Sequence, residues 1–355
     1  MAVSKGSILV TGANGGLGSS TVEWILYQRS IAEKYHGLYT VRKVESADAV
    51  KKVLRKAASV QHRYDLIPLD LASLQSVRKA AESINRRVAN GEIPPIRALV
   101  LSAAYQEHVT QNFTNDGFDM TFQSSYLSHF LLALLLLQSM DKKEGRIVVL
   151  GSWTHDTTDP RNKMAPFENM YVPEEFHEIF KDPKNIESIA KGSWGASREI
   201  PHDPDAGIRR YGASKLSEIM MMRELSYRLP KDPELSGISV LSVDPGAMPS
   251  SLTRRGTWFL RVLIPILMQL LAPIMTWWSP NGDVRTTWKS AGDVVRACFD
   301  TKDLGQYPNG VYLNGSAVAD ISPEAKDKEK TTLLWRESLR YAGVKEGDTI
   351  LTNWR

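Results

Sequence analysis

The feature that most restricts the fold of this chain is an apolar run followed at once by a glycine-rich loop. Residues 8–10 read Ile-Leu-Val, and residues 11–18 read Thr-Gly-Ala-Asn-Gly-Gly-Leu-Gly. Glycines at positions 12, 16 and 18 permit positive φ and let the backbone approach a pyrophosphate closely. A helix expected from about residue 19 to residue 28 would direct its free N–H groups at that anion. This order of strand, tight turn and helix predicts a nucleotide-binding loop.

Further apolar runs downstream alternate with segments of helical character, which predicts a parallel sheet. Such runs occur at residues 65–69, 99–101 and 146–150. A chain of 355 residues with 42% hydrophobic content can bury one large core, and no change of composition marks a second domain. We therefore expect the α/β fold class and a single domain over residues 1–355, with helices on both faces of the sheet.

Charge and cysteine content exclude several classes of protein. The net charge is only +4, and Lys and Arg are spread along the chain, so nucleic acid is not an expected partner. The one cysteine, Cys298, cannot form an intramolecular disulfide, which suits a cytoplasmic location. The first strand follows so closely on Met1 that no signal or transit peptide is expected. No set of metal ligands is predicted.

A second motif, Tyr-Gly-Ala-Ser-Lys at residues 211–215, places two functional groups on one face of a helix. A free Tyr titrates near pH ~10, and a fixed ammonium beside Tyr211 would stabilise the phenolate and lower its pKa. Tyr211 would then act as a proton donor, with Lys215 as its partner. The same spacing occurs in ordinary solvated helices, so this motif gains its meaning from the glycine-rich loop.

Together, the spaced glycines and the Tyr-x-x-x-Lys motif resemble the short-chain dehydrogenase/reductase family. The resemblance extends from about residue 6 to about residue 340. It implies a Rossmann fold with a doubly wound parallel sheet and a nicotinamide cofactor. Within the glycine-rich loop, the positions that match the family's cofactor-binding residues are Gly12, Asn14, Gly16, Leu17 and Gly18.

Other cofactor positions implied by the resemblance follow in the family's order. Arg42 and Lys43 end the second strand, where members that prefer NADP carry basic residues. No acidic residue occupies that turn to hold a free ribose hydroxyl, so we favour NADP(H) over NAD(H). Asp70 and Leu71, at the end of the third strand, match the family's adenine contact.

The loop after the fourth strand departs from the family pattern. Ser102, Ala103 and Ala104 stand where the family usually has Asn-Ala-Gly, so the hydrogen bonds of this loop are expected to be rearranged. The residues that match the family's turn beside the nicotinamide are Pro245, Gly246 and Ser250.

The resemblance also implies the catalytic residues. Ser152 follows the strand at 146–150 and matches the family's catalytic Ser, which acts with Tyr211 and Lys215. The resemblance also implies that Tyr211 and Lys215 bind the cofactor, Lys215 at the nicotinamide ribose. Ser125 stands where the family presents an Asn that helps to hold a water in the proton path to the Lys. Ser125 would hold this water with a shorter hydroxyl, or the proton path follows another route. His129, on the same segment, is expected to be a packing residue.

Two segments distinguish this chain, and the first is an insertion at residues 153–210. It is rich in proline and charge and lies between Ser152 and Tyr211, with short helices expected around 174–180 and 183–191. Because both of its ends flank the active site, we expect the insertion to roof part of the pocket. A surface elaboration remote from the substrate is the alternative.

The second segment is the expected substrate lid at residues 247–290, with an apolar stretch at 257–278. Arg261 and two prolines interrupt this stretch, and its uncharged part is shorter than the ~20 residues that span a bilayer. A transmembrane helix is therefore not expected. Three interpretations stay open: an apolar lid, a peripheral membrane contact and a dimer surface. We favour a lid with membrane contact, because Trp258, Trp277 and Trp278 at its borders suit a membrane interface.

Two further segments bear on assembly and on substrate. The helix at 130–140 is apolar nearly all round, which predicts burial on more than one side. A homo-oligomer interface and core packing explain it equally well. The C-terminal extension at 322–355 resembles the retinol-dehydrogenase and protochlorophyllide-reductase-like branch, whose members commonly act on lipophilic carbonyls or alcohols.

The resemblance implies an NADPH-dependent reductase that transfers a hydride to a ketone or aldehyde of a lipophilic small molecule. Tyr211 would protonate the developing alkoxide, and Ser152 would hold its oxygen. We predict a biosynthetic ketoreductase of the kind found in fungal secondary metabolism. A sterol- or retinoid-type dehydrogenase, a non-redox catalyst and an NADP-sensing protein are the alternatives.

Overall fold

The computed structural model describes residues 4–108, 110–163, 169–196, 203, 205–249, 252, 255 and 259–355, with the backbone alone for residues 259 and 260. These residues form one eight-stranded sheet in the order β3-β2-β1-β4-β5-β6-β7-β8. The strands are β1 (Gly6–Val10), β2 (Tyr35–Val41), β3 (Tyr64–Pro68), β4 (Ile96–Leu101), β5 (Arg146–Leu150), β6 (Ser239–Asp244), β7 (Tyr312–Asn314) and β8 (Ala317–Ala319).

Neighbouring strands pair in parallel from β3 to β7, whereas β7 and β8 pair antiparallel. The predicted α/β class with a largely parallel sheet is therefore confirmed. The last strand needs correction, because the sequence pattern placed it at 310–313 and indicated no hairpin after it. Gly315 adopts φ +65°, which lets the chain turn back at once to form β8.

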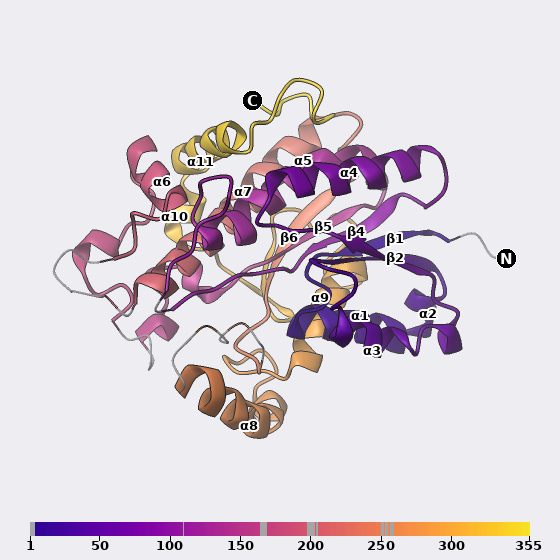
Figure 1. Cartoon of the computed structure of the whole chain (residues 1–355), viewed down its shortest axis with the longest axis horizontal. Coiled ribbons are helices and arrows are strands. Elements are labelled where there is room, and N and C mark those ends of the chain that lie inside the picture. The colour runs from indigo at the N-terminus through magenta and orange to yellow at the C-terminus, as the bar shows by residue number, and fades with distance from the viewer. Residues whose placement is uncertain are drawn as a thin grey trace.

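Helices cover both faces of the sheet (Figure 1). On one face lie α4 (Leu74–Ala89), α5 (Ser128–Leu136) and α7 (Ala206–Arg228), and on the other lie α1 (Gly16–Tyr27), α3 (Asp48–Leu54) and α9 (Thr287–Phe299), with α2 (Arg29–Ala32) between α1 and β2. Consecutive residues of a strand point to opposite faces. Leu9 therefore packs in the core under α4, α5 and α7, and Ile8 and Val10 pack in the core over α1 and α9.

The apolar helix predicted at 130–140 is α5, which a π-helical turn at Phe122–Leu127 precedes. All nine residues of α5 are buried within one chain. Phe130 contacts Trp335 of α11 (Lys328–Tyr341), with ring centres 4.9 Å apart. Core packing therefore accounts for the composition of α5 without a second copy of the chain.

The insertion and the C-terminal extension pack against each other beside α7. The insertion contains α6 (Pro183–Ala190) and a short turn at Glu174–Phe176, close to the two helices expected there. The extension contains α10 (Pro323–Lys326) and α11. Glu324 of α10 accepts the N–H of Ile179 at 3.0 Å, which joins the two segments.

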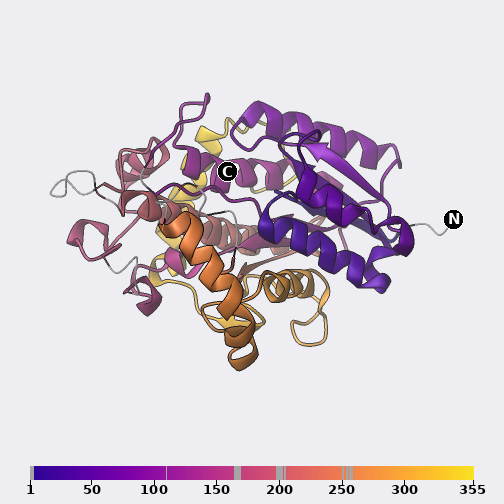
Figure 2. The ribbon, with the colours of Figure 1, turned by 60° about the horizontal axis from the view of Figure 1, so that its bottom comes forward.

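Helix α8 (Ile264–Trp278) lies outside the two layers of helices that cover the sheet, at the bottom of Figure 1 and in front in Figure 2. Of its residues only Ala272 is buried. Its exposed apolar side chains are Ile266, Leu267, Leu270, Leu271, Ile274, Met275, Trp277 and Trp278. Within the described chain, one helical segment, Arg261–Trp278, is long and apolar enough to cross a membrane by length and composition alone.

Candidate active site

The carboxyl ends of the parallel strands open onto a cavity of about 880 Å³. In a sheet of this order, loops diverge where the strand order reverses, here between β1 and β4, and leave room for a ligand. The predicted site residues that line the cavity are Gly12, Asn14, Gly16, Leu17, Gly18, Arg42, Lys43, Asp70, Leu71, Ser102, Ala103, Ala104, Ser152, Tyr211, Lys215, Pro245 and Gly246. Ser125 is not part of this lining, and Ser250 lies outside the described residues.

The glycine turn leaves no room for side chains. Gly12 adopts φ +65°, and a Cβ there would lie 2.9 Å from Cα of Ala103. A Cβ at Gly18 would lie 2.2 Å from the carbonyl oxygen of Gly12. Helix α1 begins at Gly16, and no side chain of the described residues caps its first N–H groups. The turn therefore presents bare backbone donors and the positive end of a helix to the cavity.

Positive charge lies where β2 ends. The side chain of Arg42 is 60% exposed, and its Nε lies 3.7 Å from Oδ1 of Asp70. An exposed pair at this distance contributes at most ~1 kcal/mol, so the guanidinium can exchange this partner for a bound anion. Lys43 lines the same part of the cavity.

A buried threonine connects the glycine turn to the loop after β4. The hydroxyl of Thr11 accepts the N–H of Ser102 at 2.8 Å and the N–H of Ala103 at 3.1 Å. The same oxygen lies 3.0 Å from Nε2 of His129. This loop is the one whose hydrogen bonds were expected to be rearranged, and Thr11 holds its first two residues.

The position of Ser125 departs from the prediction. Its side chain is fully buried, and its Oγ accepts the N–H of Tyr105 at 3.0 Å and donates to the carbonyl of Tyr105 at 3.2 Å. Ser124, one residue earlier, lines the cavity instead. Ser125 therefore supports the loop after β4 and does not line the cavity.

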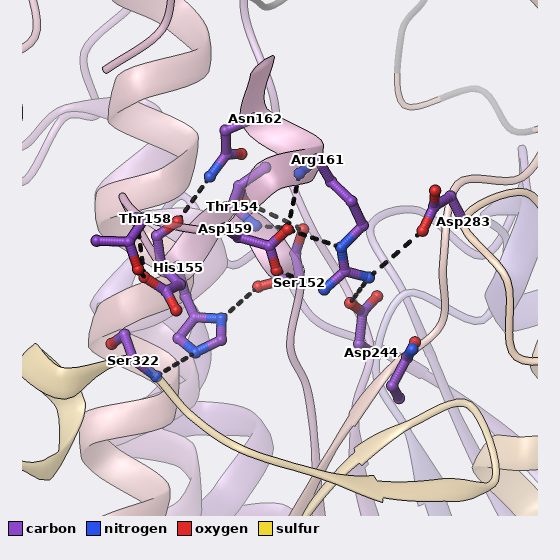
Figure 3. A network of polar contacts seen from close by, with 12 residues as sticks. Ser152, Thr154, His155, Thr158, Asp159, Arg161, Asn162, Asp244, Asp283 and Ser322 are labelled. Carbon is purple, nitrogen blue, oxygen red and sulfur yellow. Dashed lines mark hydrogen bonds and ion pairs between the residues drawn. The ribbon is translucent and has the colours of Figure 1, made fainter. Parts of the chain in front are cut away.

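Ser152 is oriented by its neighbours after β5 (Figure 3). The Oγ of Thr154 donates to the Oγ of Ser152 at 3.1 Å. His155 lies 2.7 Å through Nδ1 from the carbonyl of Ser152, and its Nε2 accepts the N–H of Ser322 at 3.1 Å. Burial lowers the pKa of His155, which favours the neutral ring that these two contacts require. The C-terminal extension thus fixes the backbone at Ser152.

Arg161 of the insertion reaches the cavity, and sequence reasoning missed it. Its guanidinium pairs with Asp159 at 2.6 Å and lies 3.6 Å from Asp244 and 3.9 Å from Asp283 (Figure 3). Asp244 in turn accepts the N–H of Gly246 at 2.8 Å and fixes the turn after β6. The three carboxylates come from separate segments, so no spacing in the sequence could have indicated this cluster.

Asn162, the next residue of the insertion, also lines the cavity and was not predicted. Its Nδ2 donates to the carbonyl of Asp156, whereas its Oδ1 is buried and makes no hydrogen bond among the described residues. The insertion therefore contributes polar groups to the cavity as well as packing against the core.

Tyr211 and Lys215 lie one turn apart on α7, and both line the cavity. The Nζ of Lys215 lies 5.4 Å from the ring centre of Tyr211. It donates to the carbonyl of Leu150 at 2.8 Å and to Oε2 of Glu218 at 2.7 Å. The sequence offered a signal for Glu218, because a carboxylate three residues after a lysine on a helix is a natural ion-pair partner.

The electrostatic balance at Tyr211 corrects one expectation. Burial raises the pKa of Tyr211 above its ordinary value, Lys215 opposes this rise and Glu218 adds to it. Burial by itself would lower the pKa of Lys215, but Glu218, Tyr211 and Asp244 together outweigh burial and raise it. The expected lowering of the pKa of Tyr211 is therefore not found, because burial and Glu218 together outweigh the ammonium.

Comparison with known proteins agrees with this geometry. A family model for short chain dehydrogenase matches residues 7–164. The short-chain dehydrogenase iccH of Talaromyces variabilis is 58% identical over 361 residues, which cover 99% of each chain. The chloroplastic protochlorophyllide reductase of Daucus carota is 28% identical over 351 residues, which cover 96% of this chain and 79% of that protein.

Solved structures share the fold. The NADPH-bound carbonyl reductase from chicken fatty liver aligns with a TM-score of 0.55 and 16% identity, covering 90% of this chain and all of that one. The promiscuous reductase LugOII, which catalyses keto-reduction at C1 during lugdunomycin biosynthesis, aligns with a TM-score of 0.56 and 16% identity, covering 89% of this chain and 99% of that one.

Replacement of Thr11 by Val tests how the loop after β4 is held. The variant keeps the shape of the side chain but leaves the N–H groups of Ser102 and Ala103 without their acceptor. We expect the free energy of unfolding, measured by urea titration, to fall by about 1–3 kcal/mol or more. Thr21→Val is the matched control, because that buried hydroxyl only donates to the carbonyl of Leu17 within α1. Equal losses in the two variants would contradict the assignment.

Proposed function

The chain belongs to the short-chain dehydrogenase family of oxidoreductases, and on this basis we propose that it is an NADPH-dependent reductase of a ketone or aldehyde on a lipophilic small molecule. The observation that carries the proposal is that Ser152, Tyr211 and Lys215 meet at one cavity that also contains the glycine turn. Two hydroxyls and a buried lysine beside a dinucleotide-sized crevice offer a proton donor close to the site of hydride transfer.

The described residues of the cavity fit NADP(H). The turn at Gly12 and Gly18, which any Cβ would fill, lets a pyrophosphate approach the backbone and the first turn of α1. Arg42 and Lys43 offer positive charge to a ribose 2′-phosphate. When bound, NADP(H) supplies the hydride, and the protein supplies orientation and the proton.

Ser152 and Tyr211 would share the oxygen of the substrate. The Oγ of Ser152 already accepts from Thr154, so its own hydrogen is free to be directed at the carbonyl oxygen. Tyr211 transfers its phenolic proton to this oxygen as the carbonyl carbon is reduced, and the product is an alcohol. The phenolate left on Tyr211 is stabilised by Lys215 and regains a proton from solvent.

The character of the cavity supports a lipophilic substrate. The apolar side chains that line it include Trp153, Met170 and Ile208 from the insertion and Ile264 and Met268 from the segment of α8. A pocket with an apolar wall and a few fixed polar groups is typical of small-molecule sites. We favour a ketone intermediate of secondary metabolism, with a sterol- or retinoid-type substrate as the second candidate.

We further propose that α8 is a lid with an inner and an outer side. Its inner side contributes Ile264 and Met268 to the cavity. Its outer side exposes Leu270, Trp277 and Trp278 at 67%, 81% and 83%. Helix α8 carries no charged residue, Arg261 is exposed just before it, and two tryptophans end it, a distribution that suits the interface of an anionic bilayer. A cytoplasmic protein docked in this way would draw a lipophilic substrate from the membrane.

Replacement of Tyr211 by Phe removes the proposed proton donor without removing bulk. We expect oxidation of NADPH with lipophilic ketones, followed by absorbance, to fall at least ~100-fold, because a positioned general acid contributes 10²–10⁴-fold. The affinity for NADPH, followed by fluorescence, should change little. Near-normal turnover in the variant would show that Tyr211 is not the acid. Conversion of substrate without loss of NADPH would instead favour the non-redox catalyst, and tight NADPH binding with no turnover of any ketone would favour the sensor.

Replacement of Arg42 by Ala tests the preference for NADP(H). Loss of a charge-assisted hydrogen bond to the 2′-phosphate should weaken NADPH binding by about 10- to 100-fold and leave NADH binding nearly unchanged. Titration of the two nucleotides by fluorescence quenching measures both effects. Arg55→Ala is the control, because Arg55 is exposed at the end of α3 and does not line the cavity. An equal loss for NADPH and NADH would contradict the role of Arg42.

The double variant Leu270→Lys/Ile274→Lys tests the outer side of α8. We expect the wild-type protein to float with vesicles of phosphatidylcholine and phosphatidylserine, and the variant to stay in the soluble fraction. Val318→Lys on β8 is the matched control, because Val318 is equally exposed but lies on the edge of the sheet. Wild-type protein that does not float, or that forms dimers dispersed by the same double variant, would overturn the membrane proposal.

A further inference from the structure

Glu218 is a buried carboxylate beside the proposed catalytic pair. It lies on α7 one turn after Lys215, and its side chain is fully buried. Its Oε2 accepts a hydrogen bond from Nζ of Lys215 at 2.7 Å. Its Oε1 makes no hydrogen bond among the described residues and lies 3.6 Å from Nδ1 of His129. One of its two oxygens therefore has no hydrogen-bond donor among the described residues.

Apart from Lys215, the groups that face Glu218 among the described residues supply no positive charge. The Nδ1 of His129, on α5, lies 2.8 Å from the carbonyl of Ser125, so its hydrogen is directed there and not at Glu218. The other titratable groups close to Glu218 and Tyr211 are Tyr126, in the turn before α5, and Asp244, at the end of β6. Neither adds positive charge, and Lys215 is the one cation at the cluster within the described chain.

A buried negative charge acts in the same direction on both members of the catalytic pair. It makes the ammonium of Lys215 harder to deprotonate, because it attracts the positive charge. It makes the phenol of Tyr211 harder to deprotonate, because it repels the phenolate. Since the two groups lie close together, their protons are lost in coupled steps that belong to the pair. Removal of the charge must lower the pKa of the pair, whichever group loses its proton first.

We infer that Glu218 is a positioning residue that keeps the Tyr211–Lys215 pair protonated and so sets the upper pH limit of carbonyl reduction. The inference rests on the proposed function. Tyr211 can give its proton to the developing alkoxide only while it holds one, and the phenolate that remains must be reprotonated from solvent before the next turnover. By holding the proton on the pair, Glu218 extends the proton-donating form of the site to higher pH. The contact with Lys215 also directs its Nζ toward the carbonyl of Leu150, at the end of β5.

The first test is a direct titration of Tyr211 in the protein without substrate or nucleotide. Tyrosine labelled with carbon-13 at the phenolic carbon reports ionisation by NMR, and the signal of Tyr211 is identified by its loss in Tyr211→Phe. In the wild-type protein we expect Tyr211 to remain protonated at pH ~10, the ordinary midpoint of tyrosine. A midpoint at or below this value would overturn the inference, and this result requires no variant of Glu218.

The second test replaces Glu218 by Gln, which keeps the shape of the side chain and removes the charge. The midpoint of Tyr211 should fall by about 1–3 pH units. The alkaline limb of kcat/KM for ketone reduction should move to lower pH by a similar amount. Glu218→Asp retains the charge and should restore most of both values, which a purely structural role would not predict.

Glu224→Gln is the matched control. Glu224 is a buried carboxylate on the same helix, but it pairs with Arg228 at 2.9 Å and does not line the cavity. Its replacement should leave the midpoint of Tyr211 unchanged. Equal midpoints in wild type and Glu218→Gln, or equal shifts in the Glu218→Gln and Glu224→Gln variants, would overturn the inference. If no ketone is reduced by the wild-type protein, the proposed function fails, while the NMR titration still decides the role of Glu218.

Discussion

Parallel pairing of the central strands is the constraint on which the rest of this structure depends. Because β1, β4, β5 and β6 run in the same direction, their carboxyl ends lie at one edge of the sheet, and the loops that follow them must meet there. Each strand must also bury both of its faces, which requires helices on either side. The sheet thus assembles the site from residues as far apart in sequence as Gly12 and Gly246, because their strands share one edge.

Buried polar groups then give that edge a fixed arrangement. Thr11 binds the loop after β4, His155 binds the backbone of Ser152 to the C-terminal extension, and Lys215 bridges α7 and the end of β5. Each of these groups would be costly to bury without its partner, so each contact excludes alternative loop conformations. The same low-dielectric surroundings give the carboxylate of Glu218 its influence on Tyr211, since charges interact more strongly there than in water. The low dielectric constant of the buried site therefore accounts both for its fixed loop conformations and for the effect of Glu218 on the proton affinity of Tyr211.

The insertion and the segment of α8 both contribute side chains to the cavity. The insertion after Ser152 contributes Arg161 and Asn162 to the cavity and packs against the C-terminal extension. Helix α8 contributes apolar side chains to the same cavity and leaves its other side exposed. The glycine turn and these two segments are thus separate parts of the chain that meet at one cavity.

The sequence by itself determined the fold class, the glycine turn and the helix that carries Tyr211 and Lys215, because these features depend on local spacing. Glycines permit a close approach of the backbone, apolar runs require burial, and one helical turn aligns two side chains. It could not determine which groups surround Tyr211, since the effect of burial and of Glu218 on its pKa depends on packing in three dimensions. Nor could it place Ser125 behind the loop of Tyr105, or bring Arg161 beside Asp244 and Asp283. Those contacts join segments far apart along the chain, and only the tertiary structure decided them. The physical reason is that strand pairing across the sheet brings together residues whose separation in the sequence does not reveal the contact.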